Sequence, residues 1–244
     1  NTVTSSVTST HTVDTAVDNP EITILGDVNS DGIFNVIEVG PDDTVTARVS
    51  LPSDFDASED VLRINGLDYS VNSTESSNGY VDVELPIDDP NISVVIIDAA
   101  GNVSDTVSES VAVDIIAQAG TVSIDNITND DMINATEASE TVTLTGTASG
   151  GDISSGDSVS MEINGTTYTT TVDDSGNWSV DVSGSDLEAD TDFNVNVVST
   201  DSVGNTVTSS VSSTHTVDVS IADITADIVD ASDTGSSNSD NVTS

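Results

Sequence analysis

Hydrophobic and polar residues alternate with a period of two through most of this chain. Within residues 158–198, three runs place Val, Met, Ile, Trp or Phe at every second position, with Ser, Asn, Asp or Glu between them. This is the pattern of short strands that bury one face. Asn-Gly and Asp-Ser-Gly-Asn sequences, which favour hairpin turns, separate the runs.

The first half of the chain has the same order of strands and turns, and we find no helical stretch of any length. The strands expected there cover residues 43–51, 60–65, 67–72, 79–85, 92–98 and 102–113. The chain also repeats itself, because residues 1–14, NTVTSSVTSTHTVD, return as residues 205–218 with one change, and a more divergent copy ends at Asp114. Repeats of about 100 residues are typical of arrays of whole domains.

About seven short strands per repeat predict an all-β fold of tandem immunoglobulin-like β-sandwiches arranged end to end. The repeat also sets the domain boundaries. Residues 1–18 are the last strand of a preceding repeat, 19–115 and 116–219 are two sandwiches, and 220–244 are the start of a further repeat. Because the chain opens within the pattern, we expect it to be a piece of a longer protein.

One segment, DVNSDGIFNVIE at residues 27–38, matches the twelve-residue calcium loop. Oxygen-bearing side chains stand at positions one, three, five, nine and twelve, a glycine at six, and a backbone carbonyl serves at seven. The expected ligands are Asp27, Asn29, Asp31, Ile33, Asn35 and Glu38. The flanks predict strands rather than the helices of an EF-hand. The alternative, an Asp/Asn/Gly turn, explains the aspartates and the glycine but not Glu38.

The second repeat carries a related segment, NITNDDMINATE, at residues 126–137. The expected calcium ligands are Asn126, Thr128, Asp130, Asp131, Asn134 and Glu137. Asp131 replaces the glycine of the first loop. We therefore expect Asp131 either to adopt the left-handed conformation at some cost or to bind the ion directly in a rearranged loop.

Further acidic residues stand where one repeat gives way to the next. Asp14 and Asp114 end their strands, and the late hairpins carry Asp98, Asn102 and Asp201 at their tips. We hypothesise that Asp14 and Asp18 cap the junction before the first sandwich, and Asp114 and Asp125 the one before the second, by bridging calcium. We also expect Asp98 and Asn102 to lie at the end where the calcium loop of the same sandwich enters. The alternative is that each terminal Asp simply stops a strand.

The composition narrows the choice of partners. Lys and Arg total 2 against 44 Asp and Glu, for a formal net charge of −42. This excludes nucleic acid and anionic membranes, which bind basic patches. Leu, Ile, Val and Phe make up about a quarter of the chain, more than a disordered chain carries. There is no Cys, and no apolar run is long enough to span a membrane. A folded polyanion needs counter-charge, and calcium supplies it.

Enzyme chemistry finds no support, so we expect the chain not to be an enzyme. The two His residues, His11 and His215, are repeat-equivalent, and Val111 takes the same place in the other repeat, so strand packing explains them. No Gly-x-Ser-x-Gly nucleophile motif occurs. Trp178 alternates with valines and is expected in the core, and the two tyrosines after the hairpin glycines, Tyr69 and Tyr168, at a sandwich edge.

Three segments of the second repeat carry a family resemblance: ETVTLTGTASGG at 140–151, SMEINGTTYTTTVDDSGNWSVDVSGSDLEADT at 160–191 and STDSVGNTVTSSVSSTHTVD at 199–218. They resemble the bacterial immunoglobulin-like extender repeats of giant RTX adhesins from Gram-negative bacteria. The resemblance implies long strings of β-sandwiches with calcium in and between them, secretion by a type I system, and a place at the bacterial cell surface.

The function this implies is that of a calcium-rigidified spacer that projects ligand-binding domains from the cell. Its partners would be neighbouring repeats of the same chain, with the target surface bound by other domains, and the segment would be monomeric. One alternative is a carbohydrate- or protein-binding module on the first sandwich, around residues 51–60 and 73–79. Another is a calcium-independent sandwich adapted to high salt, and a polysaccharide-degrading enzyme is a distant third.

Overall fold

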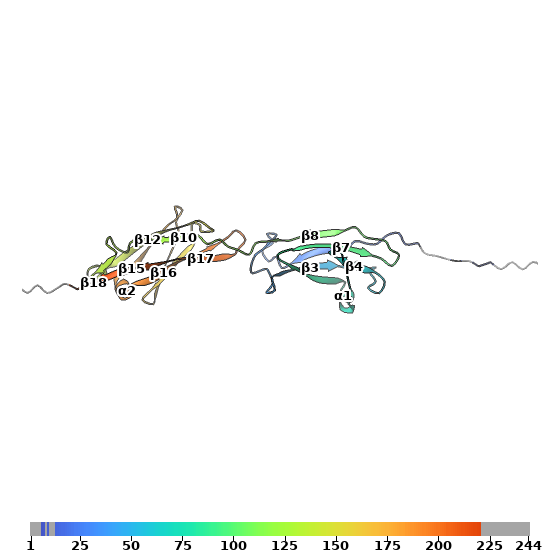
Figure 1. The fold of residues 1–244 in the computed structure, drawn as a ribbon, viewed down its shortest axis with the longest axis horizontal. Helices are drawn as coiled ribbons and strands as arrows, with labels where there is room; N and C mark the ends of the chain where they lie inside the picture. The colour runs from blue at the N-terminus through green and yellow to red at the C-terminus, as the bar shows by residue number, and fades with distance from the viewer. Residues whose placement is uncertain (1–5, 8, 10–12, 221–244) are drawn as a thin grey trace, which may run out of the picture. The chain divides into compact units, whose positions relative to one another are not determined.

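The computed structural model describes residues 6, 7, 9 and 13–220 (Figure 1). The predictions for residues 1–18 and 220–244, and that for His11, lie largely or wholly outside these residues. The chain forms two compact units. Each is a sandwich of one three-stranded and one four-stranded sheet, and each also contains a pair of short parallel strands. The prediction of an all-β fold with seven-stranded immunoglobulin-like sandwiches is confirmed.

The first unit comprises the residues up to Ala119 together with Ser199–Val207, which are the turn between β16 (Asp192–Thr200) and β17 (Thr206–Thr214) and the adjoining ends of both strands. Its three-stranded sheet has the order β1 (Glu21–Leu25), β3 (Thr44–Ser50), β6 (Tyr80–Pro86). Its four-stranded sheet has the order β5 (Leu67–Tyr69), β4 (Val61–Ile64), β7 (Asn91–Ile97), β8 (Val107–Ser110). The parallel pair is β2 (Ile33–Phe34) with β9 (Ala112–Val113).

The second unit comprises Gly120–Val198 and the residues from Thr208 onward. Its three-stranded sheet has the order β10 (Thr121–Ile124), β12 (Thr141–Ser149), β15 (Asn177–Ser183). Its four-stranded sheet has the order β14 (Thr166–Thr171), β13 (Ser158–Ile163), β16 (Asp192–Thr200), β17 (Thr206–Thr214). The parallel pair is β11 (Met132–Asn134) with β18 (Thr216–Asp218).

The alternation in the sequence becomes an alternation of buried and exposed side chains. Along β12 every second residue is buried and the residues between are exposed. Strands of both sheets contribute to each core, which includes Val49, Leu62 and Ile96 in the first unit and Leu144 and Met161 in the second. Each fully buried side chain of this size contributes about 1.5–3 kcal/mol relative to exposure. Each sandwich is therefore stabilised by a core of its own.

The aromatic and histidine predictions are also confirmed. Trp178 is 2% exposed in the core of the second unit. His215 is 7% exposed, its Nε2 lies 2.8 Å from Leu187 O, and its ring meets Phe193 edge-on. The two tyrosines, Tyr69 and Tyr168, stand on β5 and β14, the edge strands of the four-stranded sheets, packed against the cores.

The expectation of no helix is wrong for three short segments. Helix α1 covers Ser73–Asn78, α2 covers Gly184–Ala189, and a 3-10 turn, η1, covers Glu137–Ser139. A reciprocal capping box starts α1, because Asn72 accepts from the N–H groups of Thr74 and Glu75 while Glu75 accepts from the N–H of Asn72. Helices of six residues are too short for a 3.6-residue period to show in the sequence. No helix of the described part is long and apolar enough to cross a membrane.

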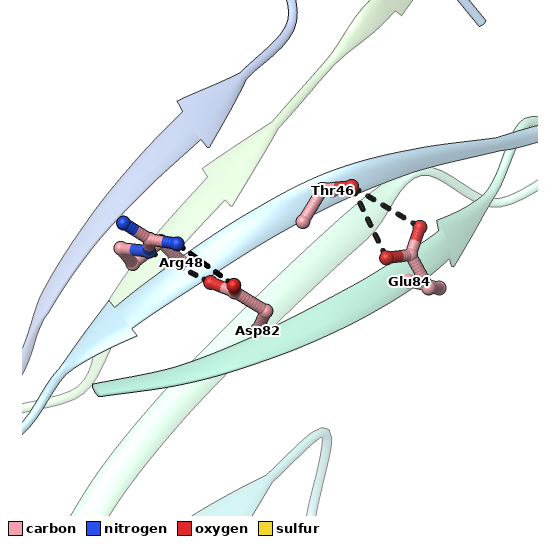
Figure 2. Close-up of polar contacts among 4 residues, drawn as sticks. All are labelled: Thr46, Arg48, Asp82 and Glu84. Carbon is pink, nitrogen blue, oxygen red and sulfur yellow. Dashed lines mark hydrogen bonds and ion pairs between the residues drawn. The ribbon is translucent and has the colours of Figure 1, made fainter. Parts of the chain in front are cut away.

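Both basic residues of the chain are used inside the first unit. Figure 2 shows Arg48 of β3 facing Asp82 of β6, at 2.8 Å, with Thr46 facing Glu84 beside them. The Arg48 guanidinium also lies 3.7 Å from the centre of the Tyr80 ring. Arg63 pairs with Asp68 at 2.7 Å across β4 and β5. The remaining carboxylates thus have no Lys or Arg of this chain left to pair with.

Gly146 on β12 provides a test of the second core. A methyl group there would lie 2.5 Å from Trp178 Cζ2 and collide with the carbonyl oxygen of Ser123. We expect Gly146→Ala to destabilise the second unit by about 1–3 kcal/mol, seen as earlier thermal unfolding of Trp178, the only tryptophan. Gly40→Ala is the control, since its added methyl would meet only ordinary contacts of 3.5 Å or more. Equal melting temperatures for the two variants would contradict this account.

Candidate metal centre

The loop of residues 27–38 lies where the first sandwich ends. It follows β1 and precedes β3, so the strands expected on either side are confirmed. Within the loop, β2 pairs in parallel with β9, and the N–H of Asp114 donates to Phe34 O at 3.0 Å. The loop is therefore fixed to the last strand of its own sandwich.

The first half of the loop is wound around its own carboxylates. Asp27 accepts from the N–H of Ser30 at 2.6 Å through Oδ1 and from that of Gly32 at 3.0 Å through Oδ2. Asp31 Oδ1 accepts from Ile33 N–H at 2.8 Å, and Asn29 Oδ1 from Asp31 N–H at 3.1 Å. Gly32 has φ of 81°, which is the left-handed turn that position six requires.

Glu38 brings the end of the loop back to its beginning. Its Oε1 accepts from the N–H groups of Val28 at 3.0 Å and Asn29 at 3.3 Å. Its Oε2 accepts from Asn35 N–H at 3.1 Å. Glu38 thus faces the same backbone segment as the early ligand positions, but one of its three accepted hydrogen bonds belongs to a reciprocal pairing with Asn35, of the capping-box type, that needs no ion.

Asn35, expected at ligand position nine, is placed differently. Its Oδ1 accepts from the N–H groups of Ile37 at 2.9 Å and Glu38 at 3.3 Å. Its Nδ2 donates to Val203 O at 2.8 Å, and the side chain is 7% exposed. The Asn-x-x-Glu spacing that makes this capping box was visible in the sequence, but the calcium pattern accounted for the same two residues.

The second loop resolves the question of Asp131. This residue adopts the left-handed conformation with φ of 60°, which was one of the two expectations, and its Oδ1 accepts from Ile127 N–H at 3.0 Å. Thr128 Oγ1 donates to Asp130 Oδ1 at 2.9 Å and accepts from Met132 N–H at 3.1 Å. These side chains support the turn of the loop.

The end of the second loop repeats the capping box of the first. Asn134 Oδ1 accepts from the N–H groups of Thr136 at 2.9 Å and Glu137 at 3.1 Å, and Glu137 Oε2 accepts from Asn134 N–H at 3.0 Å. Beside it, an open hollow is lined by Asp125, Asn126, Thr128 and Glu137 among others. The structure therefore brings four of the expected residues together around one space.

The donor chemistry of the two loops suits a hard divalent cation. All the expected donors are oxygens, and a carboxylate oxygen that accepts one N–H retains a second lone pair. Among the described residues, however, no three Asp, Glu or His side chains form a group that could hold a metal ion in this conformation.

The turn at the tip of each late hairpin, β7–β8 and β16–β17, has the same design. Asp98 accepts from Asn102 N–H at 2.8 Å and from its Nδ2 at 2.6 Å. Asp201 accepts from Asn205 N–H at 2.9 Å and from its Nδ2 at 2.8 Å. The Asn102 amide lowers the pKa of Asp98. Burial opposes the shift at Asp201, but hydrogen bonds from Asn205 and nearby N–H groups outweigh it and lower that pKa too.

The expected place of Asp98 and Asn102 is wrong. They follow the end of β7, where Ala99 N–H donates to Asp60 at 3.1 Å, whereas the calcium loop pairs with β9 at the opposite end of the sandwich. The hairpin does lie opposite the exit of the last strand, but the loop lies at that exit. Acidic residues line a hollow at the hairpin end: Asp14, Asp54, Asp56, Glu59, Asp60 and Asp98.

The other acids proposed for the junctions have local partners. Asp14 and Asp114 accept from N–H groups two residues ahead, at 3.3 and 3.2 Å, and Asp125 accepts from Thr145 Oγ1 at 2.7 Å. Asp18 is exposed ahead of β1. Sequence reasoning missed Asn205, which is 2% exposed and belongs to the first unit through its turn. Its Oδ1 accepts from Val36 N–H at 2.8 Å.

Three of the solved structures similar to this chain come from bacterial ice-binding adhesins. A calcium-stabilised adhesin that helps an Antarctic bacterium reach out and bind ice matches 85% of this chain with 42% identity and a TM-score of 0.65. A 1.5-MDa bacterial ice-binding adhesin, studied for its retention at the host cell surface, matches 82% with 43% identity and a TM-score of 0.63.

A bacterial immunoglobulin-like domain of the M. primoryensis ice-binding adhesin matches over its whole length and 42% of this chain, with 64% identity and a TM-score of 0.42. This chain belongs to the bacterial immunoglobulin-like extender repeats of giant RTX adhesins. The extender chain spans 50% and 65% of the first two structures. No protein-family model matches it, and no curated protein does.

The hairpin carboxylates predict an acid limit for the extender chain. Because the folded state lowers the pKa of Asp98 and Asp201, the stability they provide is complete above the ordinary aspartate value of about 3.9. It is lost as pH falls through the lower folded value. We expect Asp98→Asn with Asp201→Asn to flatten the fall in melting temperature below about pH 4, measured by circular dichroism without added calcium. Asp192→Asn, whose exposed carboxylate accepts no hydrogen bond from the described residues, is the control. An unchanged acid slope would contradict the assignment.

Proposed function

We propose that this chain is a structural extender segment of a large bacterial surface adhesin, and that calcium rigidifies it. The sandwiches act as spacers that hold other domains of the parent protein away from the cell. The observation that carries the proposal is the loop of residues 27–38, which combines a calcium-loop ligand pattern with direct pairing to the last strand of its sandwich. Stiffening this loop would stiffen the place where the chain leaves the sandwich.

In the first loop the residues that would hold the ion are Asp27, Asn29, Asp31, Glu38 and the carbonyl of Ile33, with Asn35 positioning Glu38. In the second they are Asn126, Thr128, Asp130, Asp131 and Glu137, with Asn134 in the corresponding place. Calcium would supply two positive charges to loops whose carboxylates otherwise repel one another. Meanwhile the residues of the chain shape each loop through backbone N–H groups and hold it against a parallel strand.

The proposal extends to the acidic ends of the repeats. Asp14, Asp18, Asp98 and Asn102 belong to the entrance of the first sandwich, where Asp14 and Asp98 line one hollow. Asp114, Asp125 and Asp201 hold the corresponding places for the second. Calcium bridging at these sites would add counter-charge where successive repeats follow one another. Such a segment works outside the cell, at the bacterial surface, as a monomer whose partners are its neighbouring repeats, and it catalyses no reaction.

Calcium dependence is tested with the isosteric variant Asp31→Asn. Asparagine keeps an oxygen for Ile33 N–H, so the loop should fold, but it removes a charged ligand. At a hundredfold excess of ion over Kd, a calcium site stabilises a folded chain by about 2.7 kcal/mol. We expect chelation with EGTA to lower the melting temperature of the wild-type chain, and to lower that of Asp31→Asn by less.

Calorimetric titration should show one binding event fewer in this variant. Glu188→Gln on the exposed side of α2 is the control, since it removes the same charge from a residue that is not an expected calcium ligand. If EGTA leaves the wild-type melting temperature unchanged, calcium has no part in the fold.

A further inference from the structure

Two turns of identical design have different surroundings. Asp98–Asn102 and Asp201–Asn205 both read Asp-x-x-Gly-Asn, and both close with the same two hydrogen bonds from asparagine to aspartate. The second turn belongs to the first compact unit, and there Asn205 is 2% exposed and Val203 6%. In the first turn Asn102 is half-buried and Ala100, the counterpart of Val203, is exposed.

Three hydrogen bonds account for the burial of the second turn. Asn205 Oδ1 accepts from Val36 N–H at 2.8 Å, and its Nδ2 donates to Asp114 O at 2.7 Å. Asn35 Nδ2 donates to Val203 O at 2.8 Å. All the groups are neutral amides or backbone atoms, so no charge of this acidic chain is buried.

The fit depends on the backbone of the turn. Gly204 has φ of 99°, a backbone conformation that residues with a side chain rarely adopt, although a methyl group on it would meet only an ordinary contact of 3.6 Å with Asn35 Nδ2. The turn therefore presents one asparagine and one carbonyl to a receptor of three parts: Asn35 Nδ2, Val36 N–H and Asp114 O. We call these three groups the amide receptor.

The second unit contains the same receptor, and no turn of the residues described up to Ser220 lies in it. Asn134, Ala135 and Asp218 correspond to Asn35, Val36 and Asp114, in the same capping box and the same parallel pairing. Asn134 is exposed where Asn35 is buried, whereas Ala135 and its counterpart Val36 are both exposed. Within the described part of the chain, neither Asn134 Nδ2 nor Ala135 N–H has a hydrogen-bond partner.

We propose that the amide receptor of Asn134, Ala135 and Asp218 is a docking surface for an Asp-x-x-Gly-Asn turn supplied by a following repeat. By the same chemistry, the Asp98–Asn102 turn is the element that a preceding repeat receives. The proposal rests on the extender function, since it needs successive repeats, but it does not depend on calcium. Recognition is by shape and neutral amides, and a turn without the final asparagine or the glycine is excluded.

The first arm of the test compares two asparagines in the present chain. Asn205→Ala and Asn102→Ala remove the same internal turn bonds, but only Asn205 also bonds to the receptor. We expect Asn205→Ala to speed amide hydrogen exchange at Val36 by roughly tenfold, the effect of losing about one hydrogen bond. We expect Asn102→Ala to leave exchange at Val36 unchanged. Equal exchange rates at Val36 in the two variants would contradict the binding of Asn205 to the amide receptor.

The second arm extends the chain by placing a second copy of residues 115–218 directly after Asp218, so that a further turn follows the free receptor. We expect exchange at Ala135 to slow by roughly tenfold relative to the present chain. Asn205→Ala in the added copy alone should restore the fast rate. Unchanged exchange at Ala135 in the extended chain, or slow exchange that survives the substitution, would overturn the proposal.

Both arms are run in calcium and in EGTA, so that the two proposals fail separately. Slow exchange at Ala135 in EGTA supports amide docking even if calcium proves to have no effect on stability. Calcium-dependent melting together with fast exchange at Ala135 in the extended chain would support the calcium proposal and overturn the docking proposal.

Discussion

The shortage of positive charge is the constraint under which the whole structure is built. Both arginines are used on strands of the first sandwich, one against Asp82 and one against Asp68. The chain carries a formal charge of −42, and many of its other carboxylates accept hydrogen bonds from backbone N–H groups, hydroxyls and asparagine amides instead. This is why Asp27, Asp98 and Glu38 each organise a turn. The attraction that remains is non-polar burial in two cores, with counter-charge taken from solution.

Much of this architecture was predictable because burial on a strand leaves a period of two in the sequence. The strands of both sandwiches, the buried Trp178 and the packing role of His215 all follow from that pattern. The short helices left no period, because six residues make fewer than two turns. The reversed position of Asp98 was an error of topology: a loop was assigned to an end of the sandwich without knowing that β2 pairs with β9.

The site was harder to predict because one pattern serves two purposes. An Asn-x-x-Glu sequence at positions nine and twelve of a calcium loop is also a capping box, and in Asn35 and Asn134 the capping role governs the side chain. Asn205 gave no signal of its own, since Asn102 stands in an identical turn and does not share its contacts. What distinguishes them is a long-range neighbour, which local sequence does not contain. The left-handed Asp131 was one of two expectations, since aspartate tolerates that backbone better than most residues, and the sequence did not decide between them.

The positions of the two arginines affect how readily proteases outside the cell can cleave this chain. Proteases that cleave after basic residues find only two candidate bonds in this chain, since it holds no other arginine and no lysine. Arg48 lies on β3, hydrogen-bonded between β1 and β6, and Arg63 on β4, between β5 and β7. Cleavage needs an extended, unpaired segment, so each bond is accessible only when its sandwich opens. A chain of this composition is resistant to trypsin-like digestion for as long as it stays folded.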